Sequence, residues 1–208
     1  MAPGLLLTNN HVIPGIEFAG KSYVIFDYEY DAEHSLLPTE RFDLTTDIFV
    51  TDEEYDFTFV SVSSTSRRDA VLDEYGHLPL VRESGKALKG EPTTIIQHAN
   101  GLPKQIAIRD SRILGRKRQF VYYTTDTNSG SSGGPVLNDD WFPVALHHRA
   151  VPDYKKTNNF IANRGIRISS IIERLDEFSD SDDHAETCLL YTSPSPRDQR
   201  GSRMPSSA

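Results

Sequence analysis

Hydrophobic and polar positions alternate in short runs along most of the chain. These runs hold four to ten residues, are rich in β-branched and aromatic side chains, and are separated by polar segments with proline and glycine. They predict strands at 5–13, 22–30, 42–50, 57–62, 93–98, 105–114, 120–125, 134–137, 142–148 and 165–169. Ten such strands predict an all-β fold, a barrel or a sandwich.

Helical periodicity is found in one segment near the C-terminus. Residues 169–178, SSIIERLDEF, place Ile171, Ile172, Leu175 and Phe178 on one face of a helix. The stretch from Ser63 to Gly90 is rich in charged and turn residues, and it separates two groups of strands. We therefore expect one domain over residues 1–178, with one half at 1–75 and the other, which includes the helix, at 76–178.

The composition changes after Phe178. The segment SDSDDHAE is acidic, and TSPSPRDQRGSRMPSSA has almost no apolar side chains to bury. Residues 179–208 are therefore predicted to be a disordered tail. From about Cys188 the tail also resembles a translated cloning adaptor, so we expect that part to be non-native.

Charge and cysteine content disfavour several classes of function. The net charge of −8 disfavours a nucleic-acid partner, and the basic cluster at 112–118 is expected to be a solvated hairpin turn. No apolar run approaches the ~18 residues of a membrane span, so no membrane partner is expected. Cys188 is the only cysteine, and the histidines lack the i, i+4 pairing of a helical metal site. We expect no metal and no cofactor.

The segment TDTNSGSSGGPVLND, residues 125–139, has the composition of a flexible linker but also contains the pattern G-x-S-x-G. A serine becomes a nucleophile only with a base and an acid beside it. In α/β-hydrolases the acid and the histidine follow the serine, with helices between strands. Here His147 and His148 lie on the next predicted strand and helices are scarce, so that order does not fit.

The order histidine, aspartate, serine does fit. His11 closes one predicted strand, Asp56 opens another, and Ser132 precedes a third. The segments LLLTNNHV, YDFTFVSV and TNSGSSGGPVLN resemble the three motifs of trypsin-like (chymotrypsin-fold) serine peptidases. IIQHANGLPKQIAI, VALHHRAVP and NRGIRISSIIERL extend the resemblance over residues 4–176, towards the disulfide-free bacterial-type branch that includes the glutamyl endopeptidases.

The resemblance implies two antiparallel six-stranded β-barrels followed by a short C-terminal helix. It implies a serine endopeptidase in which Ser132 forms an acyl-enzyme with a polypeptide substrate, His11 is the general base and Asp56 orients it. The oxyanion hole would be the backbone N–H groups of Gly130 and Ser132, since Ser129 and Ser131 lack a glycine two positions earlier. We expect a monomer.

The resemblance also implies that at least two strands precede the strand of the catalytic histidine, whereas ten residues precede His11. We therefore expect an incomplete first barrel and a natural start upstream of Met1. Any signal peptide would lie in that upstream part, so the localisation stays open.

Two sets of pocket residues predict opposite specificities. Asp126 resembles the pocket aspartate of trypsin, which binds Lys or Arg. His147, in the HH pair with His148, resembles the pocket histidine of glutamyl endopeptidases, with Thr127 as its hydroxyl partner, and a cationic imidazole favours a carboxylate. We favour an acidic residue on the acyl side of the scissile bond. The segment VALHHRAVP matches the glutamyl endopeptidases at more positions than Asp126 alone matches trypsin. Alternatively, Asp126 pairs with His147 or Arg149 and neither sets selectivity.

Two other functions are open at this point. The chain could be a catalytically silent binding module on the same fold. The segment TNNHV also suggests an HtrA-type quality-control protease, a family that usually carries a peptide-binding domain after the protease.

Overall fold

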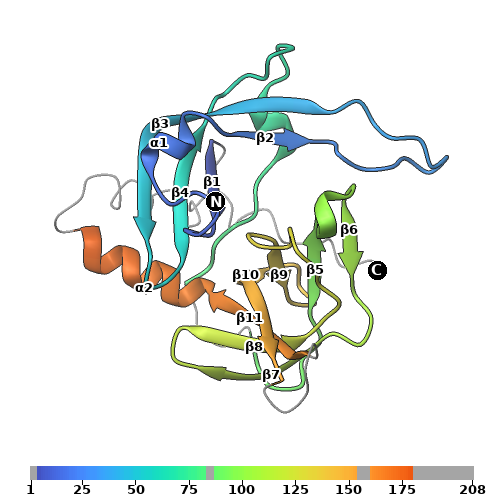
Figure 1. Cartoon of the computed structure of the whole chain (residues 1–208), viewed down its shortest axis with the longest axis vertical. Helices are drawn as coiled ribbons and strands as arrows, with labels where there is room; N and C mark the ends of the chain where they lie inside the picture. Colours follow the sequence, from blue (N-terminus) through green and yellow to red (C-terminus); the bar gives the residue numbers. More distant parts are fainter. Residues whose placement is uncertain (1–3, 83–86, 154–159, 180–208) are drawn as a thin grey trace, which may run out of the picture.

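The computed structural model describes residues 4–82, 87–153 and 160–179, and within them eleven strands form two antiparallel sheets (Figure 1). The first sheet has the order β1-β4-β3-β2, and the second has the order β6-β5-β9-β10-β11-β8-β7. The strands of the first sheet are β1 (Leu5–Thr8), β2 (Tyr23–Phe26), β3 (Glu40–Asp52) and β4 (Phe57–Val62). Those of the second are β5 (Thr94–Gln97), β6 (Gln105–Ala107), β7 (Arg112–Lys117), β8 (Phe120–Thr124), β9 (Pro135–Leu137), β10 (Pro143–Pro152) and β11 (Phe160–Arg167). The predicted all-β fold is confirmed.

Strand β4 is one of the two inner strands of the first sheet, and its alternating side chains pack in two apolar clusters. Phe57 and Phe59 pack in one cluster, whereas Val60 packs in another with Ile13 and Leu44. This is the period of two that the sequence FTFVSV predicts. In the described residues the sheet has four strands, with β1 and β2 at its edges. The first barrel is therefore incomplete here, as expected.

The second sheet curls into a barrel because the predicted strand at 105–114 is broken. Strands β6 and β7 are separated by four residues, among which Asp110 has a left-handed φ of 53°. The chain turns there, and β7 meets the residues that lead into β5: Ile113 N donates to Glu91 O at 2.9 Å. The two short strands thus take the place of one long, bent strand of a six-stranded barrel.

Two other local predictions are corrected. A one-turn helix, α1 (Ile16–Ala19), and two 3₁₀ turns, η1 (Leu72–Tyr75) and η2 (Ala99–Gly101), occur where no helix was predicted, because a single turn is too short to show periodicity. The basic cluster at 112–118 lies mostly in β7, and only Arg118 belongs to the two-residue turn into β8. The hairpin was predicted correctly, but its turn is shorter than expected.

The predicted C-terminal helix is present as α2 (Ile168–Ser179), and it crosses from the second sheet to the ends of β3 and β4 (Figure 1). One apolar cluster joins the helix to both sheets; its buried members are Leu5, Leu7, Val50, Phe57, Phe59, Leu80, Leu146, Ile166, Ile168, Ile171, Ile172 and Leu175. In the described part of the chain no helix is long and apolar enough to cross a membrane. The predicted disorder of the tail concerns residues that, from 180 on, lie outside the described ranges.

Arg174 fastens α2 to the turn between β3 and β4. Its Nε donates to Asp52 Oδ2 at 2.7 Å, and its Nη1 donates to Glu177 Oε2 at 2.6 Å. Asp52 is buried, and its Oδ1 accepts the backbone N–H of Tyr55 at 2.6 Å. Since this turn ends at Asp56, the helix supports a residue that the sequence assigns to the active site.

We expect Arg174→Met to lower the free energy of unfolding of the 208-residue chain by about 1–3 kcal/mol, because it leaves a buried carboxylate without its charged donor. Urea denaturation followed by circular dichroism measures the change. The control is Arg116→Met, at an exposed arginine of β7, with an expected change within about 0.5 kcal/mol. Equal effects of the two substitutions would contradict this role for Arg174.

Candidate functional site

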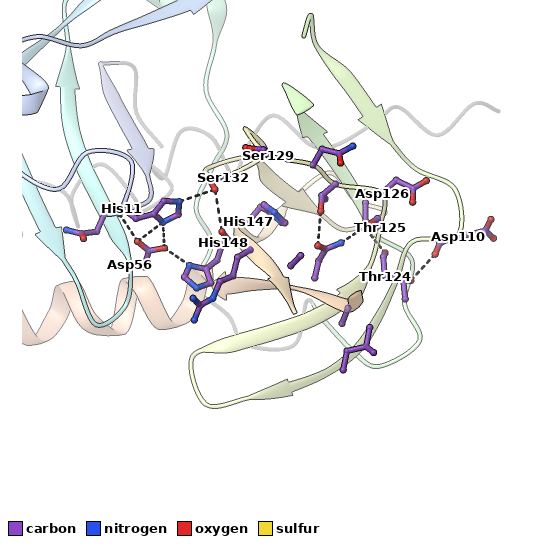
Figure 2. A pocket seen from close by; sticks show the side chains of 18 of the residues that line it. His11, Asp56, Asp110, Thr124, Thr125, Asp126, Ser129, Ser132, His147 and His148 are labelled. Atoms are coloured by element: carbon purple, nitrogen blue, oxygen red, sulfur yellow. Dashed lines mark hydrogen bonds and ion pairs between the residues drawn. The ribbon is translucent and has the colours of Figure 1, made fainter. Parts of the chain in front are cut away.

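The structure brings together the three residues that the sequence predicts as a catalytic triad (Figure 2). His11 Nε2 lies 3.0 Å from Ser132 Oγ, and His11 Nδ1 lies 2.9 Å from Asp56 Oδ2. The three residues line one open cleft. His11 follows β1, Asp56 ends the β3–β4 turn, and Ser132 belongs to the loop between β8 and β9. The site is therefore built where loops of the two sheets meet.

A tight turn after β1 carries His11. Asn9 O accepts the N–H groups of Val12 and Ile13 at 3.1 and 3.2 Å, and Ile13 is buried in the core of the first sheet. The Asn9 side chain donates through Nδ2 to Asp56 O at 3.0 Å. Asn9 thus joins the backbone on both sides of the His11–Asp56 contact.

The Asp56 carboxylate is ionised although it is largely buried. Burial raises the pKa of the Asp56 carboxyl, but hydrogen bonds from His148, from the backbone N–H of His11 and from the His11 ring bring this pKa below its ordinary value. The His11 N–H donates to Oδ1 at 2.9 Å. An ionised Asp56 accepts the Nδ1 proton of His11, which leaves the Nε2 lone pair facing Ser132.

The serine loop distinguishes Ser132 from its neighbour. Ser131 is buried, and its Oγ accepts the N–H of Asn128 at 3.3 Å, away from His11. The loop is also fastened to β10, where His147 O accepts the N–H of Gly133 at 3.0 Å. Its fixed hydrogen bonds disfavour the alternative interpretation of the segment as a flexible linker.

The two predicted oxyanion-hole donors are available. Among the described residues, the backbone N–H groups of Gly130 and Ser132 meet no protein acceptor, whereas that of Ser131, between them, donates to Asn128 O at 3.1 Å. Gly130 has a φ of +90°, and a Cβ built there would lie 3.0 Å from His98 O. Glycine is thus required at this position by both its backbone conformation and its surroundings.

The His148 side chain contacts the Asp56 carboxylate. The sequence did not predict this role, because His148 was expected to bind substrate. In the pairing of β10 with β11, His147 opposes Gly165 and Arg149 opposes Arg164, so His148 is the extra residue of a β-bulge. A bulge redirects a side chain, and here Nδ1 of His148 contacts Asp56 Oδ2. The Nε2 atom of His148 accepts Nη2 of Arg164 at 2.7 Å.

His11, Asp56 and His148 place three metal-ligand atoms within 4.8 Å of one another. The Arg164 contact explains this cluster without a metal. An arginine can only donate, so Nε2 of His148 is the acceptor and its Nδ1 carries the proton. A protonated Nδ1 has no lone pair to offer a cation. That no metal binds stays a prediction.

His147 is buried beside Tyr123, whose Oη lies 2.7 Å from His147 Nδ1. Burial, with smaller contributions from His148 and His11, lowers the pKa of His147 to about 4. Burial also raises the pKa of the Tyr123 hydroxyl well above its ordinary value. At neutral pH His147 is therefore a neutral imidazole, which corrects the expected cation. When the Tyr123 hydroxyl donates to Nδ1, the ring proton is on Nε2.

Asp126 and Thr127 line the same cleft as His147, but among the described residues neither bonds to it. Thr127 Oγ1 donates to Asn163 Oδ1 at 2.7 Å instead of pairing with the histidine. Asp126 lines the cleft with an exposed side chain, and its backbone carbonyl accepts Gln97 Nε2 at 2.9 Å. Within the described chain no bond or ion pair joins its carboxylate to His147 or to Arg149. The sequence did not predict the hydrogen-bond partners of His147, Thr127 and His148, which are Tyr123, Asn163 and Arg164. Nothing in the sequence around these partners marks their long-range contacts.

The comparisons with known proteins agree with the fold. The family described as the trypsin-like peptidase domain matches residues 1–146. The uncharacterized protein y4fB of Sinorhizobium fredii is 36% identical over 214 residues, which cover 85% of this chain and 32% of the relative. Secreted RxLR effector protein 73 of Plasmopara viticola is 30% identical over 184 residues, which cover 75% of this chain and 42% of the relative. The chain thus spans less than half the length of either relative.

Among solved structures, the inactive form of Rv3671c from M. tuberculosis, crystallised as a serine-to-alanine mutant, is similar with a TM-score of 0.59. The alignment covers 88% of this chain and 80% of that one at 14% identity, a likeness of fold alone.

Gly130→Ala should lower the free energy of unfolding more than Gly90→Ala does. Both glycines have φ near +90°, at +90° and +91°, so both substitutions carry the left-handed penalty of about 1–2 kcal/mol. Only at Gly130 would the new Cβ also meet backbone atoms, whereas it meets nothing within 4 Å at Gly90. Urea denaturation of both variants measures the difference, and equal losses would contradict the tight packing of the serine loop.

Proposed function

The chain belongs to the trypsin-like peptidase family, and from this premise we propose that it is a serine endopeptidase that uses Ser132, His11 and Asp56. The observation that carries the proposal is the pair of contacts made by His11, at 3.0 Å to the serine hydroxyl and 2.9 Å to the aspartate. A serine hydroxyl needs this arrangement to lose its proton near neutral pH.

In the proposed reaction, His11 Nε2 takes the proton of Ser132 as Oγ attacks the carbonyl carbon of the peptide bond. The N–H groups of Gly130 and Ser132 stabilise the oxyanion, and the ionised Asp56 stabilises the imidazolium. His11 then gives its proton to the departing amine, which leaves an acyl-enzyme on Ser132. Water hydrolyses this ester with the same base, and no cofactor takes part.

For specificity we propose an acidic side chain on the acyl side of the scissile bond. A neutral His147 with its proton on Nε2 can donate to a carboxylate oxygen, and Tyr123 holds that tautomer through the 2.7 Å contact at Nδ1. The competing Asp126 has an exposed side chain, where water weakens its attraction for a substrate cation.

Ser132→Ala is expected to reduce kcat by on the order of 10⁴- to 10⁶-fold, because it removes the nucleophile. Ser131→Ala should keep most of the activity, since the Ser131 hydroxyl bonds within its own loop. Both are measured with wild type on one mixed peptide library. An inert Ser131 variant beside an active Ser132 variant would refute the assignment, and an inert wild type would favour the silent binding module.

The same library tests specificity, with cleavage expected mainly after Glu or Asp. Tyr123→Phe should lower kcat/KM for acidic peptides about two- to tenfold, the effect of losing one hydrogen bond. Tyr122→Phe is the matched control, a neighbour in β8 with no bond to His147. Cleavage mainly after Lys or Arg would overturn the proposal in favour of Asp126.

A further inference from the structure

A chain of polar contacts continues from Asp56 of the triad through His148 to Arg164. Asp56 Oδ2 contacts Nδ1 of His148, and Nε2 of His148 contacts Nη2 of Arg164 at 2.7 Å. Arg164 is in β11, where it pairs with Arg149 of β10, the residue next to the bulged His148. Arg164 does not line the substrate cleft, although Asn163 beside it does.

Two neighbours set the state of His148, because the ionised Asp56 favours a donor at Nδ1 and Arg164 requires an acceptor at Nε2. A guanidinium stays protonated and has no acceptor, so the neutral imidazole must turn its lone pair at Nε2 towards Arg164 and carry its proton on Nδ1. That proton is the one donated to Asp56. With the proton on Nε2 instead, a lone pair would face the carboxylate, and Asp56 would lose a donor.

Phe120 holds both partners in place. The Arg164 guanidinium carbon lies 4.2 Å from the centre of the Phe120 ring, and the same ring stacks on His148 at 5.9 Å between centroids. The side chain of His148 is 11% exposed, so water has little access to this contact. The guanidinium and the imidazole are therefore fixed by one aromatic ring.

Arg164 also carries an unfavourable feature. Its Nε is buried and has no hydrogen-bond partner among the described residues. A buried unpaired donor destabilises a fold, so packing alone does not account for an arginine here. Its contact with His148 gives it a role in the site.

We propose that Arg164 is a positioning residue, which fixes His148 in the tautomer that donates to Asp56 and so keeps the carboxylate aimed at His11. The role in turnover rests on the proposed peptidase function, whereas the tautomer does not. Because Arg164 lies outside the cleft, its loss should change the chemical step and leave substrate binding unchanged.

The tautomer is measured by ¹⁵N NMR of the histidine-labelled chain, in wild type, Arg164→Met and Arg167→Met. Arg167 is the matched control, an arginine of β11 that bonds Arg118 O and Ser169 Oγ instead of the site. We expect His148 to carry its proton on Nδ1 in wild type and in Arg167→Met, and to lose this single state in Arg164→Met. If that variant does not fold, Arg164→Gln replaces it. An amide can either donate to Nε2 of His148 or accept from it, so it does not dictate the tautomer as a guanidinium does.

Kinetics give the second measurement. We expect Arg164→Met to lower kcat about 10- to 100-fold, as for the loss of one hydrogen bond to a charged group, with KM unchanged. Arg164→Lys retains a cationic donor and should recover most of kcat. In a His148→Asn background, where there is no tautomer to fix, Arg164→Met should have little further effect on kcat.

The outcomes separate the two proposals. An inert wild type whose His148 has the expected tautomer would refute the peptidase function and leave the role of Arg164 on His148 intact. An active wild type whose tautomer and kcat are the same in Arg164→Met would overturn the inference alone. A fall in kcat with an unchanged tautomer would also overturn it, because Arg164 would then act by another route.

Discussion

The Asp56 carboxylate is a charge held largely out of water, and the arrangement of the two sheets has to supply its hydrogen bonds. Its donors come from the turn after β1, through the backbone and ring of His11, and from the bulge of β10, through His148. A buried charge without such partners would be strongly unfavourable. The carboxylate therefore links the packing of the two sheets to the geometry around Ser132. If the sheets shifted relative to one another, Asp56 would lose the donor from His148, whereas His11 belongs to the same sheet as Asp56.

The parts of the candidate site that the sequence predicts depend on local pattern and on the family resemblance. The strand period placed His11 and Asp56 at strand ends, and the glycine at position 130 distinguished Ser132 from Ser131. The roles of His148 and Arg164 could not be predicted in this way. They depend on a bulge that arises only when β10 pairs with β11, and no local pattern marks that pairing. The break between β6 and β7 was missed for the same reason, because it follows from closure of the barrel.

The specificity residues show how burial changes the meaning of a motif. In the sequence, Asp126 and His147 are expected to be opposite charges in one pocket. In the structure, His147 is buried on Tyr123 and its pKa is about 4, whereas Asp126 is exposed to water. Burial makes the histidine a neutral donor, and exposure weakens the aspartate as a binding charge. Neither effect can be deduced from residue type, because both are produced by strands that lie far apart in the chain.

Helix α2 completes a core that also contains side chains from the N-terminal third of the sequence. Phe57 and Phe59 share a cluster with Ile171 and Leu175, which follow them by more than a hundred residues. On the ribosome, the first sheet leaves the exit tunnel long before this helix is made. Its apolar face then stays in water through the synthesis of the entire second sheet, and during that interval it is a surface for chaperones or for aggregation. Folding of the two halves is thus coupled in time as well as in space.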